Sequence, residues 1–155
     1  MDGIKIAIGA DHRGFALKES FKKAWQERLE CGLLEYDLIE WVDCGAFDDD
    51  RSDYPTFAHS VSKNIISGEV DRGILLCGTG AGMAMAANRH YGIYAAVAWN
   101  KEVAQRVRRE DHCNVLVLPA DYLSVSDVVD LVRAWLGAEP QEGRYAERIK
   151  MVDVL

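Results

Sequence analysis

Short apolar segments alternate with amphipathic segments along almost the whole 155-residue chain. The apolar runs have the length of β-strands, and they predict strands at residues 5–9, 38–42, 74–76, 93–98 and 114–119. Between them, apolar residues recur every three or four positions, which predicts helices at residues 15–29, 56–67, 83–89, 101–109 and 125–136. Strands that alternate with helices in this way predict a doubly wound α/β fold, with a five-stranded parallel sheet in a three-layer αβα, Rossmann-like arrangement.

The chain is expected to form one domain over residues 1–155, because no linker, repeat or low-complexity stretch divides it. A tail over residues 139–155 follows the last predicted helix and should end in a short helix of its own. Apolar residues make up 49% and charged residues 28%, values that are ordinary for a soluble globular protein. No apolar stretch is long enough to span a membrane and no signal-peptide pattern is present, so we expect a cytoplasmic protein.

The formal charge of −7 argues against a general partner of nucleic acid or of an anionic membrane, although it allows a small anionic ligand. The four cysteines show neither paired spacing nor accompanying histidines, so we expect free thiols and no metal site. They are Cys31, Cys44, Cys77 and Cys113.

A glycine-rich turn follows the third predicted strand, with Cys77 at the end of the strand and a predicted helix after the turn. Backbone N–H groups at such a turn, together with the helix dipole, can hold an anion and lower the pKa of the neighbouring thiol. The Gly78-x-Gly80-x-Gly82 spacing places its third glycine one residue too early for a dinucleotide site. A second pair of glycines, at the ends of residues 9–14, lacks the lysine and hydroxyl residue of a phosphate-binding loop.

Other candidates follow from the rule that ligands of such sheets bind beyond the carboxyl ends of the strands. Asp11 and His12 come directly after the first strand, where they could act as an oriented acid and base or serve only as a helix cap and a surface histidine. Arg144 and Arg148 lie four residues apart and therefore share one face of the tail helix. Two guanidinium groups suit a phosphate or carboxylate ligand, but pairing with nearby glutamates explains the spacing equally well.

Several of these segments together resemble the ribose-5-phosphate isomerase B family, which includes the galactose-6-phosphate isomerase subunits. The resemblance covers essentially the whole chain and rests on residues 6–19, 53–55, 68–82, 86–88 and 143–148. It implies an aldose–ketose isomerase that acts on a pentose phosphate or related sugar through a cis-enediolate, without metal or cofactor. It also implies a homodimer or a dimer of dimers with composite active sites, in which the tail packs on the partner.

The resemblance assigns a role to residues in each part of the chain. Cys77 would be the base that moves the proton between C1 and C2 of the sugar. The enediolate oxygens would be stabilised by Thr79 and by the amides of Gly78, Gly80, Ala81 and Gly82. Asp11 and His12 would bind the sugar and help to open its ring, and Tyr54 would line the pocket. Arg144 and Arg148 would hold the phosphate.

The chain departs from the family pattern before and after the fifth strand. Glu110 stands at the position of the family's ring-opening histidine and Asp111 at the asparagine that follows it, so His112 becomes the candidate acid, with Asp111 in the substrate-binding set. Asp121 stands where the family has an arginine that contacts the phosphate, and Tyr145 replaces a histidine.

Opposite charges 4 Å apart attract by about 4 kcal/mol at an effective dielectric constant near 20, so reversing a charge at Asp121 cannot be neutral for a dianion. This favours a substrate other than ribose 5-phosphate: a shorter phosphate, a differently placed one, or an unphosphorylated sugar. Two other hypotheses remain, a half-site subunit that needs a paralogous partner and a binding protein that has lost the chemistry. Retention of both Cys77 and Thr79 counts against the last of these.

Overall fold

The computed structural model describes residues 3–34 and 39–154. Its strands are β1 (Ile4–Ala10), β2 (Ile39–Asp43), β3 (Arg72–Cys77), β4 (Ala95–Val97) and β5 (Val115–Pro119). Its helices are α1 (Phe15–Glu30), α2 (Tyr54–Ile66), α3 (Ala81–Ala87), α4 (Lys101–Asp111), α5 (Val125–Leu136) and α6 (Arg144–Val152), with a 3-10 turn at Ala120–Tyr122. All the predicted elements are therefore present; the predicted start of the second strand, at residue 38, lies outside the described residues.

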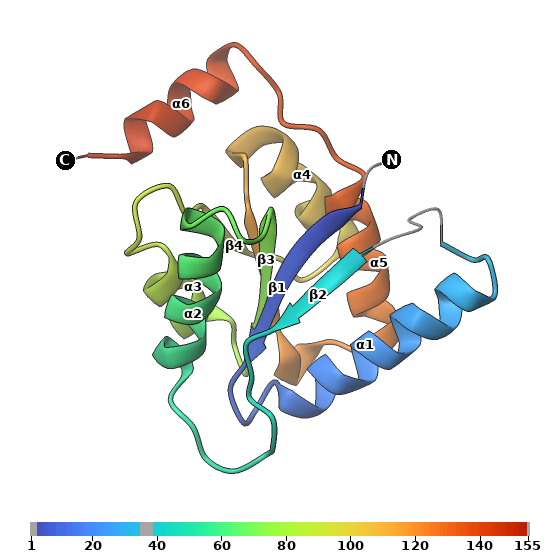
Figure 1. Cartoon of the computed structure of the whole chain (residues 1–155). Coiled ribbons are helices and arrows are strands. Elements are labelled where there is room, and N and C mark those ends of the chain that lie inside the picture. The colour runs from blue at the N-terminus through green and yellow to red at the C-terminus, as the bar shows by residue number, and fades with distance from the viewer. Residues whose placement is uncertain (1–2, 35–38, 155) are drawn as a thin grey trace.

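The five strands form one parallel sheet in the order β2-β1-β3-β5-β4. Figure 1 shows α2 and α3 on one face of this sheet and α1, α4 and α5 on the other, which confirms the predicted three-layer architecture. The edge strand β4 is shorter than predicted, and within the described residues it pairs with β5 alone. None of the helices in the described residues is long and apolar enough to cross a membrane.

Alternate residues of the central strand β3 enter two separate cores, as the period of a strand requires. Ile74 and Leu76 pack among residues of α1 and α5, whereas Leu75 and Cys77 pack among residues of α2 and α3. The last residue of β3 thus points its thiol toward the layer of α2 and α3, at the end of the sheet where β1 and β5 also finish.

A fully buried lysine fixes the loop that follows β2. The Nζ atom of Lys18, on α1, donates to the two carboxylate oxygens of Asp43 at 2.7 and 2.9 Å and to the carbonyl of Ala46 at 2.8 Å. Asp43 also accepts from Lys22 at 2.8 Å and from the backbone of Gly45 at 2.9 Å. Burial alone would raise the pKa of Asp43, but these hydrogen bonds outweigh it and lower the pKa.

We expect Lys18→Met to lower the free energy of unfolding by about 3 kcal/mol, because it removes the buried partner of the half-buried Asp43 carboxylate. Urea denaturation measures this, with Lys23→Met as the matched control. Lys23 lies on the same helix, is exposed and is 3.9 Å from Glu27, so its loss should cost under about 0.5 kcal/mol. The ion pair also predicts a pH dependence. Because the folded pKa of Asp43 lies below its unfolded value of about 3.9, the contribution of Asp43 to the free energy of unfolding is present above that pH and lost below it. Asp43→Asn should therefore reduce the loss of stability at acid pH, and an unchanged loss contradicts the assignment.

Candidate functional site

A cavity of about 420 Å³ opens at the carboxyl ends of β1, β3 and β5. It is lined by Asp11, Arg13, Tyr54, Cys77, Gly78, Thr79, Gly82 and Asp121. Six of these residues belong to the site predicted from sequence, and these six come from three separate stretches of the chain. Arg13 was not among the predicted site residues, and Asp121 appeared only as a departure from the family pattern. The topology therefore brings these six residues together at the expected edge of the sheet.

Cys77 lines this cavity, and the residue is only 5% exposed. Burial raises the pKa of the thiol, and the nearby carboxylate of Asp11 raises it further. Backbone N–H groups of Met83, Gly80 and Thr79 act in the opposite direction but do not compensate. The expectation that the turn and helix would lower this pKa is therefore wrong for the single chain, because desolvation outweighs the backbone dipoles.

We expect the Cys77 thiol to react slowly with iodoacetamide at pH 7, with a rate that still rises above the ordinary thiol range of about pH 8.5. Mass spectrometry of the Cys77 peptide across pH 6–10 measures this. The exposed Cys31 of the same molecule provides the internal control for reagent activity. Fast alkylation of Cys77 that is complete at pH 7 would contradict the raised pKa.

The turn after Cys77 brings backbone close to three side chains. A Cβ on Gly82 would lie 2.7 Å from the Tyr54 ring, and one on Gly78 would lie 2.7 Å from Nε of Arg13 and 2.8 Å from the carboxylate of Asp121. Gly80 has a left-handed φ of 80° and is the N-cap of α3. The amide of the next residue, Ala81, donates to the Thr79 hydroxyl oxygen at 3.2 Å. Glycine at these positions allows this approach, so the backbone of the turn itself lines the cavity at Gly78 and Gly82.

Asp11 and His12 are both held in place by hydrogen bonds to loop backbone. Oδ1 of Asp11 accepts from the amides of Arg13 at 3.0 Å and Gly14 at 3.1 Å, so it closes the turn before α1. The N-cap of α1 is Gly14 and has no side-chain cap, so the prediction that Asp11 is the helix cap is wrong. Asp11 also lines the cavity, where it can reach a ligand. Nδ1 of His12 is 3.2 Å from both the nitrogen and the oxygen of Ser52, and the loop before α2 therefore orients the ring.

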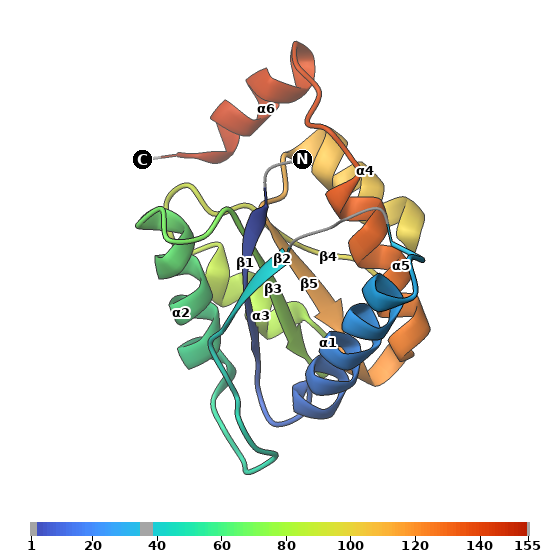
Figure 2. The same ribbon diagram turned by 45° about the vertical axis from the view of Figure 1, so that its right-hand side comes forward.

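Four predicted site residues lie at the opposite end of the sheet in the same chain. Asp111 and His112 end α4, directly before β5 begins, and Figures 1 and 2 show α6 beyond the amino ends of the strands. Nε2 of His112 is 2.8 Å from the carbonyl of Gln141. The guanidinium groups of Arg144 and Arg148 lie 5.0 and 5.9 Å from the centre of the Tyr145 ring. One chain therefore does not bring these residues to Cys77.

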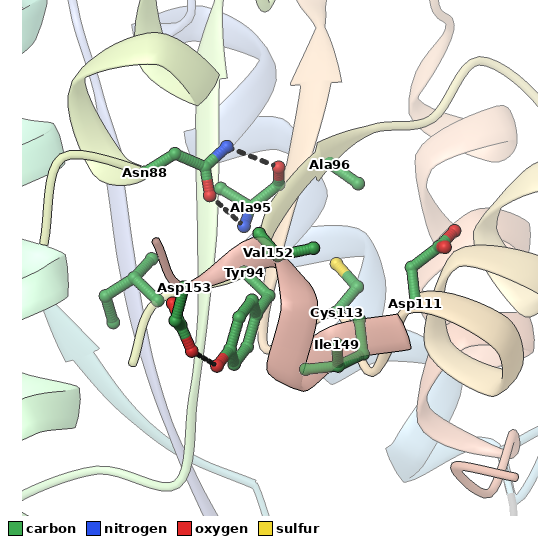
Figure 3. A pocket seen from close by; sticks show the side chains of 10 residues that line it. Asn88, Tyr94, Ala95, Ala96, Asp111, Cys113, Ile149, Val152 and Asp153 are labelled. Carbon is green, nitrogen blue, oxygen red and sulfur yellow. Dashed lines mark hydrogen bonds between the residues drawn. The ribbon is translucent and has the colours of Figure 1, made fainter. Parts of the chain in front are cut away.

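A second cavity, of about 380 Å³, separates α6 from the edge strand β4 (Figure 3). The Tyr94 hydroxyl donates to Asp153 at the end of α6, and this hydrogen bond raises the pKa of Tyr94 to about 12. The Asn88 amide bonds both backbone groups of Ala95 at 2.8 Å and so pairs the free edge of β4. The hydrogen bond between Tyr94 and Asp153 therefore ties the end of the tail helix to the residue that precedes β4.

Burial also acts on the other titratable groups of the second cavity, Cys113 and Asp111. Burial raises the pKa of the Cys113 thiol to about 12, and its Sγ donates to the carbonyl of Val115 at 3.0 Å. Burial, followed by the neighbouring charge of Glu110, raises the pKa of Asp111. Across residues 3–34 and 39–154, no group of three or more histidine, cysteine or acidic side chains is placed to hold a metal ion.

Comparison with known proteins identifies this arrangement. The model of the Ribose/Galactose Isomerase family matches residues 6–152. The chain belongs to this family. Ribose-5-phosphate isomerase B of Escherichia coli is 36% identical over 151 residues, which cover 97% of this chain and 95% of that protein. D-erythrulose-4-phosphate isomerase 2 of Mycolicibacterium smegmatis is 35% identical over 150 residues, with coverage of 93% and 92%.

Solved structures of this isomerase family have the same fold as the chain. The ribose 5-phosphate isomerase of Thermotoga maritima superimposes with a TM-score of 0.86 at 39% identity, covering 97% of each chain. Ribose-5-phosphate isomerase B of Mycoplasma genitalium, solved with bound ribulose-5-phosphate, gives a TM-score of 0.83 at 32% identity and covers 98% of this chain and 95% of that one. The relatives confirm the resemblance noted in the sequence and place the chain among aldose–ketose isomerases.

Proposed function

We propose that the chain interconverts the aldose and ketose forms of a small sugar phosphate, a pentose phosphate or a near relative, through a cis-enediolate. The observation that carries this proposal is the Cys77 thiol beside the amide-lined glycine turn, in a cavity with Asp11 and Tyr54. A proton-transfer reaction of this kind needs a base at the carbon atoms and hydrogen-bond donors at the oxygens, and the cavity offers both. Relatives named for ribose 5-phosphate and D-erythrulose 4-phosphate support the substrate class.

In the proposed reaction, the Cys77 thiolate takes the proton from C2 of the open-chain aldose and returns it to C1. A proton moves from O2 to O1 at the same time, so the product is an isomer and no atom is gained or lost. Thr79 and the amides at Gly78, Gly80, Ala81 and Gly82 stabilise the negative oxygens of the intermediate. Asp11 and His12 bind the sugar, and the ring of Tyr54 closes the side of the cavity above Gly82.

We expect Cys77→Ala to lower kcat by about a thousandfold, because it removes the base and leaves the donors in place. A coupled assay with ribose 5-phosphate, erythrose 4-phosphate and free ribose measures turnover, and calorimetry measures whether the ligand still binds. Cys31→Ala, at an exposed position outside the cavity, is the matched control and should change neither quantity. Unchanged turnover in Cys77→Ala would refute the proposed base.

The rest of the proposed site comes from a second copy of the chain. Arg144 and Arg148 of that copy would hold the phosphate, and Asp111 and His112 would reach the ring oxygen. These residues lie at the far end of the sheet from Cys77 within one chain, so they can serve the reaction only across an interface. Additional positive charge from the arginines would also lower the pKa of the thiol on assembly.

A mixture of two inactive variants tests the composite site. Cys77→Ala and the double variant Arg144→Ala/Arg148→Ala should each be inactive, yet their refolded mixture should regain about a quarter of the wild-type activity, because half of the dimers are mixed and each of these has one intact site. Chromatography with light scattering confirms mixing. No recovery in a mixture shown to contain mixed dimers would contradict composite sites. Recovery that requires a paralogous chain would favour the half-site hypothesis.

A further inference from the structure

The cavity beside Cys77 has one cationic side chain among the described residues that line it, that of Arg13. The same cavity holds two carboxylates, Asp11 and Asp121. An anionic group that entered the cavity of a single chain would therefore meet more negative than positive charge, unless Arg13 faced it. The orientation of Arg13 therefore determines how favourably an anion binds in this cavity.

Arg13 is held over the glycine turn by Asp121. Its Nη2 atom donates to Oδ2 of Asp121 at 2.6 Å, and its Nε would lie 2.7 Å from a Cβ on Gly78. The backbone amide of Asp121 donates to the carbonyl of Gly78 at 3.1 Å, so Asp121 itself is anchored to the turn. A side chain that is 58% exposed thus has a defined place against the glycine turn.

We infer that Arg13 is a substrate-binding residue that contacts the anionic group of the substrate, and that Asp121 is the residue that positions it. In the described part of the chain, Asp121 engages only the Nη2 atom of Arg13, and the other N–H groups of the guanidinium remain available to a ligand. A guanidinium supported on one side by a carboxylate is well suited to bind a phosphate with its remaining donors. The inference rests on the proposed function and specifies a phosphorylated rather than a free sugar.

The pairing with Arg13 changes the effect that Asp121 is expected to have on an anionic ligand. From sequence alone, Asp121 adds a negative charge that opposes a phosphate. In the structure, the same carboxylate is paired with a guanidinium that comes from the loop after β1, 108 residues away. The pair is neutral as a whole, and Gly78 provides the space in which it lies against the turn.

Binding to the Cys77→Ala protein tests the inference without any need for turnover. Calorimetry compares ribose 5-phosphate with ribose in this background, with Arg13→Gln, Arg13→Lys or Asp121→Asn added. We expect Arg13→Gln to weaken binding of ribose 5-phosphate about tenfold while leaving ribose unchanged, since a charge-assisted hydrogen bond is lost. Arg13→Lys should give a smaller loss, because it keeps the charge without the fork of donors.

Asp121→Asn should weaken binding of ribose 5-phosphate in the same direction, and the double variant Arg13→Gln/Asp121→Asn should bind it no worse than Arg13→Gln alone. This non-additivity is expected of a positioning residue and not of a general loss of stability. The matched control is Glu27→Gln, which removes the carboxylate of an exposed ion pair on α1 and should have no effect.

Tighter binding of ribose 5-phosphate by Asp121→Asn would overturn the inference and make Asp121 a filter against anions. Equal losses for ribose and ribose 5-phosphate in Arg13→Gln would also overturn it. Failure of the proposed function appears elsewhere, as absence of isomerase turnover in the wild-type protein, so the two failures are distinguishable.

Discussion

The site depends on the close approach of the loop after β1 to the end of β3. The amide of Asp11 donates to the carbonyl of Leu76 at 3.3 Å, and a Cβ on Gly14 would lie only 2.5 Å from the same carbonyl oxygen. This contact involves backbone on the strand side, which cannot move aside as a flexible side chain can. A glycine at position 14 is therefore the condition under which Asp11 and Arg13 reach the neighbourhood of Cys77 and Gly78.

Burial of the Cys77 thiol and the partial charges of the turn amides have opposite effects on its pKa. The last residue of β3 belongs to the core formed with α2 and α3, and this packing fixes the direction of the Sγ atom at the cost of removing water from it. A thiolate needs solvent or positive charge, and within one chain the turn amides do not make good the lost hydration. Within one chain this placement therefore favours the protonated thiol. The tail arginines of a second copy are proposed to supply the positive charge that would favour the thiolate.

The sequence was sufficient to predict the fold class and the location of the site, because both follow from local patterns. The apolar runs predicted all five strands, and the rule for parallel sheets placed Asp11 and Cys77 at the same edge. The raised pKa of Cys77 could not be predicted, since it depends on how deeply the thiol is buried by α2 and α3. The insertion of β5 between β3 and β4 also left no local signal.

The position of β5 between β3 and β4 also explains why Arg13 could not be identified from the sequence. The residues that follow β1 and β5 meet only because both strands flank β3, and nothing in the spacing of Arg13 and Asp121 indicates this. The available signal is a pair of opposite charges, Arg13 and Asp121, in the segments that follow the two strands beside β3. The tail lies at the other end of the sheet. Tyr94 and Asp153 tie α6 to the sheet beside β4, at the amino ends of the strands, so α6 and Arg144 at its start lie far from the cavity of the same chain. A phosphate held by both Arg13 and Arg144 would therefore span two chains, and the catalytic unit of the proposed isomerase would be the assembly and not the monomer.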